Sequence, residues 1–314
     1  MENGVLITGA NGFIGSYTTL LLESLGYRVV PCSRREARDP DLSLLPIKTK
    51  TLPVDVTDTA RFRELCEKEN VNCIVHIAQP RGEERPEMMH LSYRAMTNVL
   101  EVARDRKIRR VIFTSSGAVY GPVRRKDQRL IQEDDPVPVY PTFIYRCTKI
   151  MGEWMGDFYA EHYGVSFIAL RVASVFGPGQ KKGIGAAIKD GILGRECRLY
   201  LTRVPDDLIF VKDVAQAIRL ACFCELPTHR VFNIASPRSY GEEDLVQAMQ
   251  KQLPDIAFTL GKHPDAATTN LYRQRDNLDV TRARDELGFI PEFDLDRGIA
   301  EIATWVRSEK DRLR

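Results

Sequence analysis

The length, composition and charge of the chain limit the classes of protein to which it can belong. It has 314 residues, of which 43% are hydrophobic and 28% charged, the balance of an ordinary soluble globular protein. The formal net charge of +2 gives no reason to expect nucleic acid or an anionic membrane as a partner. No apolar run approaches the ~20 residues that span a bilayer, and no basic leader with a cleavage site precedes the first apolar run. We therefore expect a cytoplasmic protein with one large domain and a smaller lobe.

The cysteines and histidines predict neither disulfides nor a metal site. The seven cysteines are odd in number and contain no CxxC pair, which indicates reduced thiols. The five histidines are scattered without the spacing of paired metal ligands, so no metal is expected.

The first half of the chain alternates short apolar runs with helical patterns. Strands are predicted over residues 4–8, 28–32, 52–55, 73–78, 111–115 and 166–172. Helices are predicted over residues 13–25, 58–69, 87–106 and 143–162. Such alternation predicts an α/β fold with a Rossmann-type, doubly wound parallel sheet covered by helices on both faces.

After residue 172 the alternation becomes irregular. Further strands are predicted over residues 208–211 and 231–234, and further helices over residues 214–224, 237–253 and 283–310. The simplest organisation is a Rossmann-type nucleotide-binding domain over residues 1–172, which takes back about residues 208–236. A small C-terminal α/β substrate-binding lobe is then assembled from residues 173–207 and 237–314.

A glycine-rich turn joins the first predicted strand to the first predicted helix. Its glycines, Gly9, Gly12 and Gly15, have the spacing GxxGxxG. Glycine permits a tight turn and close backbone approach, and a helix N-terminus offers unpaired N–H groups to a pyrophosphate. An isolated glycine cluster can be a mere turn, but the strand–turn–helix context favours a dinucleotide site. The predicted cofactor contacts here are Gly9, Asn11, Gly12, Phe13, Ile14 and Gly15.

The end of the second strand indicates which dinucleotide is bound. A carboxylate there would bind the ribose 2′-hydroxyl, yet Ser33, Arg34 and Arg35 occupy the segment, with no acidic residue before Glu36. An arginine fork suits a 2′-phosphate, so Ser33 and Arg34 are predicted to bind the cofactor. NADP is favoured and NAD remains possible, because two arginines at a strand end can also be simple surface residues.

A Tyr-x-x-x-Lys pair, Tyr145 and Lys149, lies in the helix predicted over residues 143–162, one turn apart on the same face. A phenol with a pKa near ~10 is a poor base at neutral pH. A lysine ammonium beside it favours the phenolate, so Tyr145 can exchange a hydroxyl proton while hydride moves at the same carbon. Ser116, at the end of a predicted strand, can hydrogen-bond the substrate oxygen. The three residues are predicted to be catalytic.

The opposite face of this helix is apolar. It carries Met151, Trp154, Met155 and Phe158. That face is available either for the core or for a partner helix. Cys147 points about 200° away from Tyr145 on a helical wheel, so we do not expect it in the active site.

These motifs together resemble the extended short-chain dehydrogenase/reductase superfamily of NAD(P)-dependent sugar epimerases, dehydratases and reductases. The resemblance runs nearly end to end through TGANGFIG, DVTD, HIA, TSSGAVYG, YRCTK, residues 171–180 and 207–215, and ARDELGFIP. It implies that Tyr145 is the acid/base, that Tyr145 and Lys149 also contact the cofactor, and that Ser116 faces the substrate. It places Asp55 and Val56 by the adenine and Ala78 beside the cofactor. It also implies a homodimer built from the helices over residues 87–106 and 143–162.

Departures from the family pattern narrow the chemistry. Dehydratases of the family carry Asp-Glu after the catalytic Ser/Thr, but Gly117 and Ala118 stand here and cannot transfer protons, so dehydration is not expected. Ser174 replaces an Asn that helps nucleotide-sugar epimerases bind the diphosphate, and Asp206 replaces an Arg. Both changes point away from a typical nucleotide-sugar.

The substrate-binding residues are predicted to be Ser116, Ser174 and Arg275. Arg273 and Arg275 either hold an anion or are surface arginines. The leading hypothesis is hydride transfer at a secondary alcohol or ketone of a sugar, sugar acid or nucleotide sugar. The alternative is a nucleotide-sugar 4-epimerase with tightly bound NAD, and a remote one is a non-catalytic NADP-binding sensor or scaffold.

Overall fold

The fold is built on a six-stranded parallel sheet. The computed structural model describes residues 4–35, 37–80, 85–121, 129–137, 143–200, 206–261 and 277–313. Its strands are β1 (Gly4–Thr8), β2 (Val29–Cys32), β3 (Val71–His76), β4 (Arg110–Ser116), β5 (Phe167–Val172) and β9 (Val231–Ile234). They lie in the order β2-β1-β3-β4-β5-β9, and every pair is parallel. The chain reverses its direction of travel across the sheet between β1 and β3, and doubly wound sheets bind ligands at that point.

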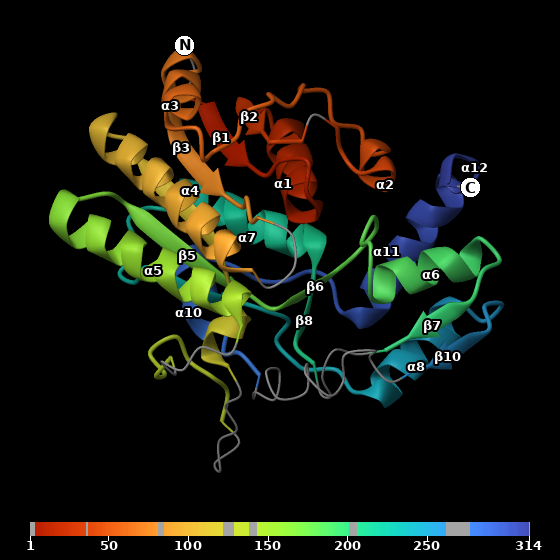
Figure 1. Ribbon diagram of the computed structural model, residues 1–314. Coiled ribbons are helices and arrows are strands. Elements are labelled where there is room, and N and C mark those ends of the chain that lie inside the picture. The colour runs from red at the N-terminus through yellow and green to blue at the C-terminus, as the bar shows by residue number, and fades with distance from the viewer. Residues whose placement is uncertain are drawn as a thin grey trace.

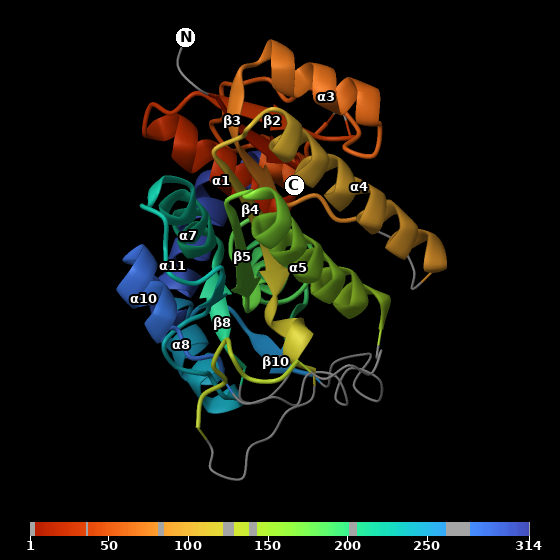
Figure 2. The same ribbon diagram turned by 90° about the vertical axis from the view of Figure 1, so that its left-hand side faces the viewer.

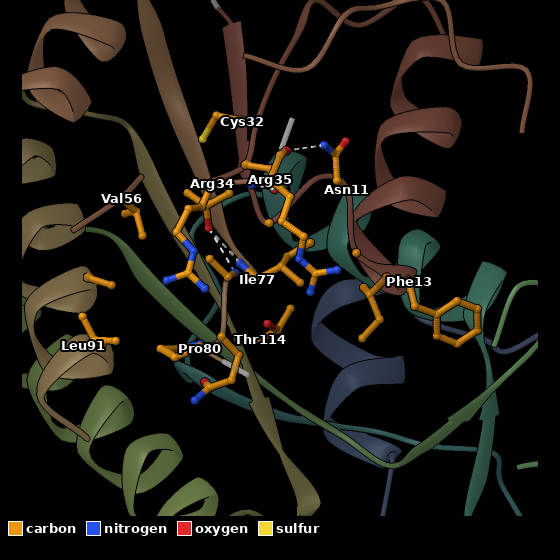
Figure 3. Close-up of a pocket in the computed structure, with 18 of the residues that line it drawn as sticks. Asn11, Phe13, Cys32, Arg34, Arg35, Val56, Ile77, Pro80, Leu91 and Thr114 are labelled. Atoms are coloured by element: carbon orange, nitrogen blue, oxygen red, sulfur yellow. Dashed lines mark hydrogen bonds between the residues drawn. The ribbon is translucent and has the colours of Figure 1, made fainter. Parts of the chain in front are cut away.

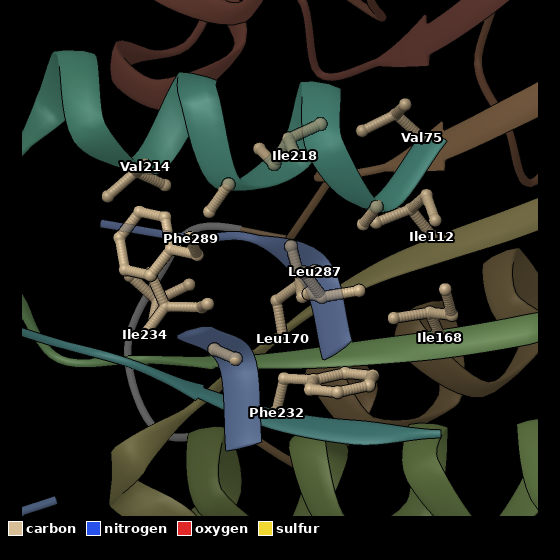
Figure 4. Packing of buried hydrophobic residues seen from close by; sticks show 14 of the residues in the cluster. Val75, Ile112, Ile168, Leu170, Val214, Ile218, Phe232, Ile234, Leu287 and Phe289 are labelled. Atoms are coloured by element: carbon tan, nitrogen blue, oxygen red, sulfur yellow. The ribbon is translucent and has the colours of Figure 1, made fainter. Parts of the chain in front are cut away.

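Helices cover both faces of this sheet, as Figures 1 and 2 show. One face is covered by α3 (Thr59–Lys68), α4 (Pro86–Asp105) and α5 (Ile144–Tyr163). The other is covered by α1 (Phe13–Ser24), α7 (Val211–Phe223) and α10 (Thr281–Leu287). In the second layer Val214 and Ile218 of α7 pack over Ile112 and Leu170 of the sheet (Figure 4). The Rossmann-type α/β fold predicted from the sequence is confirmed.

A smaller unit lies beyond the carboxyl ends of the strands (Figure 1). It contains two small parallel sheets, β6 (Ser174–Phe176) with β8 (Leu208–Phe210) and β7 (Cys197–Leu199) with β10 (Phe258–Leu260). Its helices are α6 (Ile184–Ile192), α8 (Glu242–Gln252), α11 (Leu295–Ser308) and α12 (Lys310–Leu313). A separate apolar cluster, with Phe176, Met249 and Ile302 among its members, fills it. The domain boundaries proposed from the sequence stay a prediction: β9 joins the large sheet, whereas β8 pairs outside it.

Two predicted elements are wrong. The strand expected over residues 52–55 is only an isolated bridge between Leu52 and Cys32, because Pro53 has no N–H to continue a ladder. The helix expected over residues 283–310 is two helices, α10 and α11. Gly288 ends α10 in the left-handed conformation, at φ +69°, and Asp294 caps α11 by accepting from the Arg297 N–H. Between β2 and α3 the chain also forms one further short helix, α2 (Pro40–Ser43).

Candidate active site

A cavity of about 330 Å³ opens at the carboxyl ends of β1, β3, β4 and β5 (Figure 3). It lies at the reversal point of the sheet, where the fold predicts a ligand. From the N-terminal half of the chain its walls include Thr8, Gly9, Asn11, Gly12, Phe13, Ile14, Cys32, Ser33, Arg34, Arg35, Asp55, Val56, Thr57, Ala78 and Gln79. From the later strands and α5 they include Thr114, Ser115, Ser116, Tyr145, Lys149, Val172 and Ala173.

The glycine turn forms one wall, and there is no room for a side chain at Gly9 or Gly15. Gly9 has φ +72°, and a Cβ on it would lie 2.9 Å from the backbone of Ala78. A Cβ on Gly15 would collide with the Gly9 carbonyl oxygen, so Gly15 allows α1 to approach the turn although it does not itself line the cavity. Gly12 caps α1 without a side-chain hydrogen bond. A close backbone turn against an uncapped helix N-terminus fits the pyrophosphate of a dinucleotide.

At the end of β2, two arginines face the same cavity. Figure 3 shows the guanidinium groups of Arg34 and Arg35 extending into it. Ser33 also lines the cavity. The Asn11 Nδ2 donates to the Arg35 carbonyl at 2.7 Å, and the Asn11 Oδ1 accepts from the Thr51 hydroxyl at 2.8 Å. Asn11 therefore holds the arginine segment against the glycine turn. Arg35 was not among the predicted cofactor contacts, although it stands directly beside Arg34 in the sequence.

The cavity is also lined by Asp55 and Val56, which were expected beside the adenine, and by Ala78, which was expected beside the cofactor. The Asp55 carboxylate accepts from the Thr57 N–H at 2.9 Å and from the Thr57 hydroxyl at 2.8 Å, which fixes the turn that follows residue 55. Val56 lines the cavity, and its carbonyl accepts from the Asn98 side chain at 2.8 Å. Ala78 follows β3, and its N–H donates to the Thr8 hydroxyl at 3.2 Å. The three predicted residues thus surround one part of the cavity.

Helix α5 carries Tyr145 and Lys149 to the floor of the cavity. The Lys149 Nζ donates to the Thr114 carbonyl at 2.7 Å and lies 4.9 Å from the centre of the Phe113 ring and 5.5 Å from that of Tyr145. Burial lowers the pKa of Lys149 to about 7, and the charge of Glu153 opposes this shift. Lys149 can therefore change its protonation state near neutral pH.

Beneath Lys149 lies a neutral histidine, which the sequence analysis did not single out. Burial and the charge of Lys149 lower the pKa of His76 to about 3. The Thr8 hydroxyl, which accepts from the N–H groups of Ile77 and Ala78, lies 2.9 Å from the His76 Nδ1. Because those N–H groups occupy the oxygen as an acceptor, we assign its proton to the hydrogen bond with Nδ1, which leaves the ring proton on Nε2.

Ser116 ends β4 at the cavity wall. Its hydroxyl accepts from the Ala118 N–H at 3.1 Å, which starts the short 3₁₀ helix η1 (Gly117–Tyr120). Among the described residues, the structure records no acceptor for the proton of this hydroxyl. Ser116 can therefore donate that proton in a hydrogen bond to a ligand oxygen. Gly117 and Ala118 bring no acid or base to this position.

Among the other predicted residues, the structure separates some from the cavity. The Ser174 hydroxyl donates to the buried Asp206 carboxylate at 3.1 Å, and neither is among the described lining residues. Cys147 also lies outside the described lining. Arg273 and Arg275 fall outside the described residues. Ser116 is therefore the one substrate-binding candidate that the described part of the chain places in the cavity wall.

The cavity also contains Thr114 and Gln79, which the sequence analysis missed as site residues. Thr114 offers its carbonyl to Lys149, and its position within TSSGAVYG was the available signal. The Gln79 Nε2 donates to the hydroxyls of Ser92 and Thr148, each at 3.2 Å, and so links the end of β3 to α4 and α5. Within the described ranges no cluster of His, Cys, Asp or Glu could hold a metal ion, and no helix is long and apolar enough to cross a membrane.

Comparisons with known proteins agree with this geometry. Residues 5–235 match the model of the NAD dependent epimerase/dehydratase family. The chain is 25% identical to a putative UDP-glucose 4-epimerase of Methanocaldococcus jannaschii, over 97% of this chain and 98% of that protein. It is also 25% identical to the dTDP-4-dehydro-6-deoxyglucose reductase of Escherichia coli, over 98% of both.

A solved structure extends the likeness beyond sugar enzymes. The L-threonine dehydrogenase of Clostridium difficile superposes with a TM-score of 0.82 at 24% identity, covering 100% of this chain and 99% of that one. This likeness concerns the fold alone. The match over residues 5–235 shows the family: the chain belongs to the NAD dependent epimerase/dehydratase family, within the extended short-chain dehydrogenase/reductase superfamily predicted from its sequence, and is an NAD(P)-dependent enzyme of the epimerase/reductase type.

Proposed function

We propose that the protein transfers hydride between NADP(H) and a secondary alcohol or ketone of a sugar or sugar derivative. The observation that carries this proposal is the convergence of Tyr145, Lys149 and Ser116 on the cavity that the glycine turn also lines. A non-catalytic sensor would not need this arrangement of a phenol, a buried ammonium and a hydroxyl. Dehydration is not part of the proposal, because Gly117 and Ala118 supply no proton-transferring group.

Residues of the chain carry out proton transfer and hold the substrate oxygen. The bound nicotinamide cofactor supplies or accepts the hydride. Tyr145 exchanges the proton of the reacting hydroxyl through its phenol oxygen, and the Lys149 ammonium favours the phenolate electrostatically. Ser116 donates its hydroxyl proton to the substrate oxygen and holds it in place as negative charge develops. The Thr114 carbonyl fixes the Lys149 Nζ, so this cation needs no reorganisation during the reaction.

The preference for NADP rests on Arg34 and Arg35 at the end of β2. Both are exposed side chains that line the cavity, and no carboxylate stands among residues 32–35, the described segment at the end of β2. Arg34→Ala should weaken NADPH binding about tenfold or more while leaving NADH binding nearly unchanged, as isothermal titration would measure. Equal losses for the two dinucleotides would contradict a contact with the 2′-phosphate.

The sugar substrate is supported by the names of the sequence relatives, an epimerase and a reductase of nucleotide sugars. The main alternative is a nucleotide-sugar 4-epimerase that keeps NAD bound through the reaction. The two differ in whether the cofactor exchanges. Mass spectrometry of the purified protein under native conditions should find no stoichiometric NAD if the enzyme is a net reductase or dehydrogenase. A full complement of NAD would favour the epimerase.

A homodimer is part of the proposal. Helices α4 and α5 lie side by side on one face of the molecule, as Figures 1 and 2 both show. Large apolar side chains of these helices are exposed, including Trp154 at 61% and Phe158 at 50%. Exposed apolar patches on a folded monomer mark interaction sites, and a twofold axis lets one such patch cover another.

The direct test of the catalytic assignment is Tyr145→Phe. It removes one hydroxyl and keeps the ring, so dinucleotide affinity should be nearly unchanged while turnover falls at least about a hundredfold. Turnover would be followed with a panel of nucleotide sugars, free sugars and sugar acids at 340 nm. Wild-type turnover in the Tyr145→Phe protein would refute the role given to Tyr145.

A further inference from the structure

We propose that Glu153 is a positioning residue: locked to Arg171, it holds a buried negative charge one helical turn from Lys149, which favours the ammonium, and it braces the end of β4 that carries Ser116. The effect of Glu153 on catalysis rests on the proposed hydride-transfer function. Its contacts, however, are independent of any substrate, so they can be tested separately.

Close packing of α5 on the sheet brings Glu153 to this place. A Cβ on Gly152 would lie 2.5 Å from the Phe113 ring, and a Cβ on Gly156 would collide with the Phe167 ring. These two glycines therefore let the helix lie directly on β4 and β5. As a result Glu153, one turn after Lys149 on the same face, is buried with only 6% of its side chain exposed.

The Glu153 carboxylate is held by hydrogen bonds from two strands. The Arg171 guanidinium of β5 donates from Nε to Oε1 at 3.0 Å and from Nη2 to Oε2 at 2.7 Å. The Ser115 hydroxyl of β4 donates to Oε1. Ser115 pairs with Arg171 in the sheet and precedes Ser116. One carboxylate thus ties the catalytic helix to both strands next to Ser116.

Arg171 is fixed in turn from its far side. Its Nη1 donates to the Tyr120 hydroxyl at 2.8 Å and to the Glu133 carbonyl at 3.0 Å. The Tyr120 hydroxyl donates to the Asn233 Oδ1 at 2.8 Å. Because Nε, Nη1 and Nη2 are all hydrogen-bonded, the guanidinium is held against Glu153. Such a bidentate, buried pair is rigid, and removing one partner leaves the other as an uncompensated charge.

The charges around Lys149 determine in which direction the loss of Glu153 would shift the pKa of Lys149. The groups that face it are Glu153 and Tyr145 on α5 and His76 on β3, with Arg171 of β5 behind Glu153. His76 is neutral because its pKa lies far below neutrality. Burial lowers the pKa of Lys149, and Glu153 opposes that shift. Without the carboxylate, Arg171 would add an unbalanced positive charge, and Lys149 should lose its proton at a lower pH.

The experiment is competitive acetylation of Lys149 in the cofactor-free full chain with dilute acetic anhydride, read by mass spectrometry from pH 5 to pH 10. The acetylation rate of Lys149, divided by that of the exposed Lys68, reports the fraction of Lys149 that is in the neutral amine form. Glu153→Gln should move the labelling midpoint of Lys149 down by about one pH unit or more. The matched control is Glu161→Gln, two turns further along α5, where 63% of the side chain is exposed and the partner is Arg230. It should leave the midpoint unchanged.

An unchanged Lys149 midpoint in a folded Glu153→Gln protein would overturn the inference. If that variant does not fold, the double variant Glu153→Gln/Arg171→Met removes both charges and leaves none uncompensated. Its midpoint should also fall, by less than in the single variant, and no fall would again overturn the inference.

Activity gives the second measurement. Glu153→Gln should lower kcat more at pH 8.5 than at pH 6, with little change in KM, because the lysine cation is lost earlier on the alkaline side. A loss equal at both pH values would indicate only structural damage and would contradict the proposed role. If the wild-type protein shows no dinucleotide-linked turnover at all, the proposed function fails, while the labelling midpoint still decides the role of Glu153.

Discussion

The two faces of α5 reverse the usual pattern of a surface helix. The face against the sheet carries Lys149 and Glu153, both buried, whereas the outer face exposes Trp154 and Phe158. A surface helix ordinarily buries apolar residues and exposes charged ones. Buried charges are costly unless they are paired or functional, and exposed aromatic side chains are unusual unless a partner covers them. The inner face therefore indicates chemistry, and the outer face indicates assembly.

Substitutions on the inner face should lower turnover more than substitutions on the outer face. We expect the largest loss of turnover from Lys149→Met. The substitution keeps an unbranched side chain of similar length but removes the ammonium beside the Tyr145 ring. Turnover at pH 7 should fall about a thousandfold, as measured at 340 nm. A loss of turnover of less than tenfold would contradict the assignment of the inner face to catalysis, because Lys149 would then be a buried charge without a catalytic role.

His76 gives an intermediate effect, on stability rather than on turnover. Its folded pKa of about 3 lies below the ordinary value of 6.5, so the unfolded chain binds a proton that the folded chain does not. The neutral ring therefore contributes stability above pH 6.5, and this contribution is lost as the pH falls toward 3. Between pH 7.5 and pH 4.5 the wild type should lose about 2–3 kcal/mol more than His76→Gln in urea unfolding. Parallel losses in the two proteins would show that His76 is not held neutral.

The outer face should affect assembly and leave the chemistry nearly intact. Trp154→Glu should shift the protein from dimer to monomer in analytical ultracentrifugation, since a central aromatic residue typically contributes about 2 kcal/mol or more to an interface. Turnover per chain should change less than about twofold. The control is Leu226→Glu, at another large hydrophobic residue that is 77% exposed and lies outside α4 and α5. A wild-type protein that is already monomeric, or a Leu226→Glu protein that dissociates equally, would contradict the assembly role of this face.

The sequence predicted the parts of the molecule that depend on local pattern. The glycine turn, the alternation of strands and helices, and the pair Tyr145 and Lys149 all follow from short-range spacing. The position of Glu153 does not, because its burial depends on how closely Gly152 and Gly156 let α5 approach the sheet. His76 was not predicted as a site residue for a different reason: a histidine in an apolar strand is usually a core residue. The break at Gly288 was missed because the apolar pattern continues on both sides of it.

The measurement that most directly tests the central claim follows the hydride itself. NADPH carrying deuterium at both C4 positions of the nicotinamide would be incubated with the enzyme and the carbonyl substrate found in the screen. The carbinol carbon of the alcohol product should carry deuterium, and the Tyr145→Phe protein should form this product at least about a hundredfold more slowly. Product formed without deuterium, or at an unchanged rate by Tyr145→Phe, would contradict hydride transfer run by the inner face of α5.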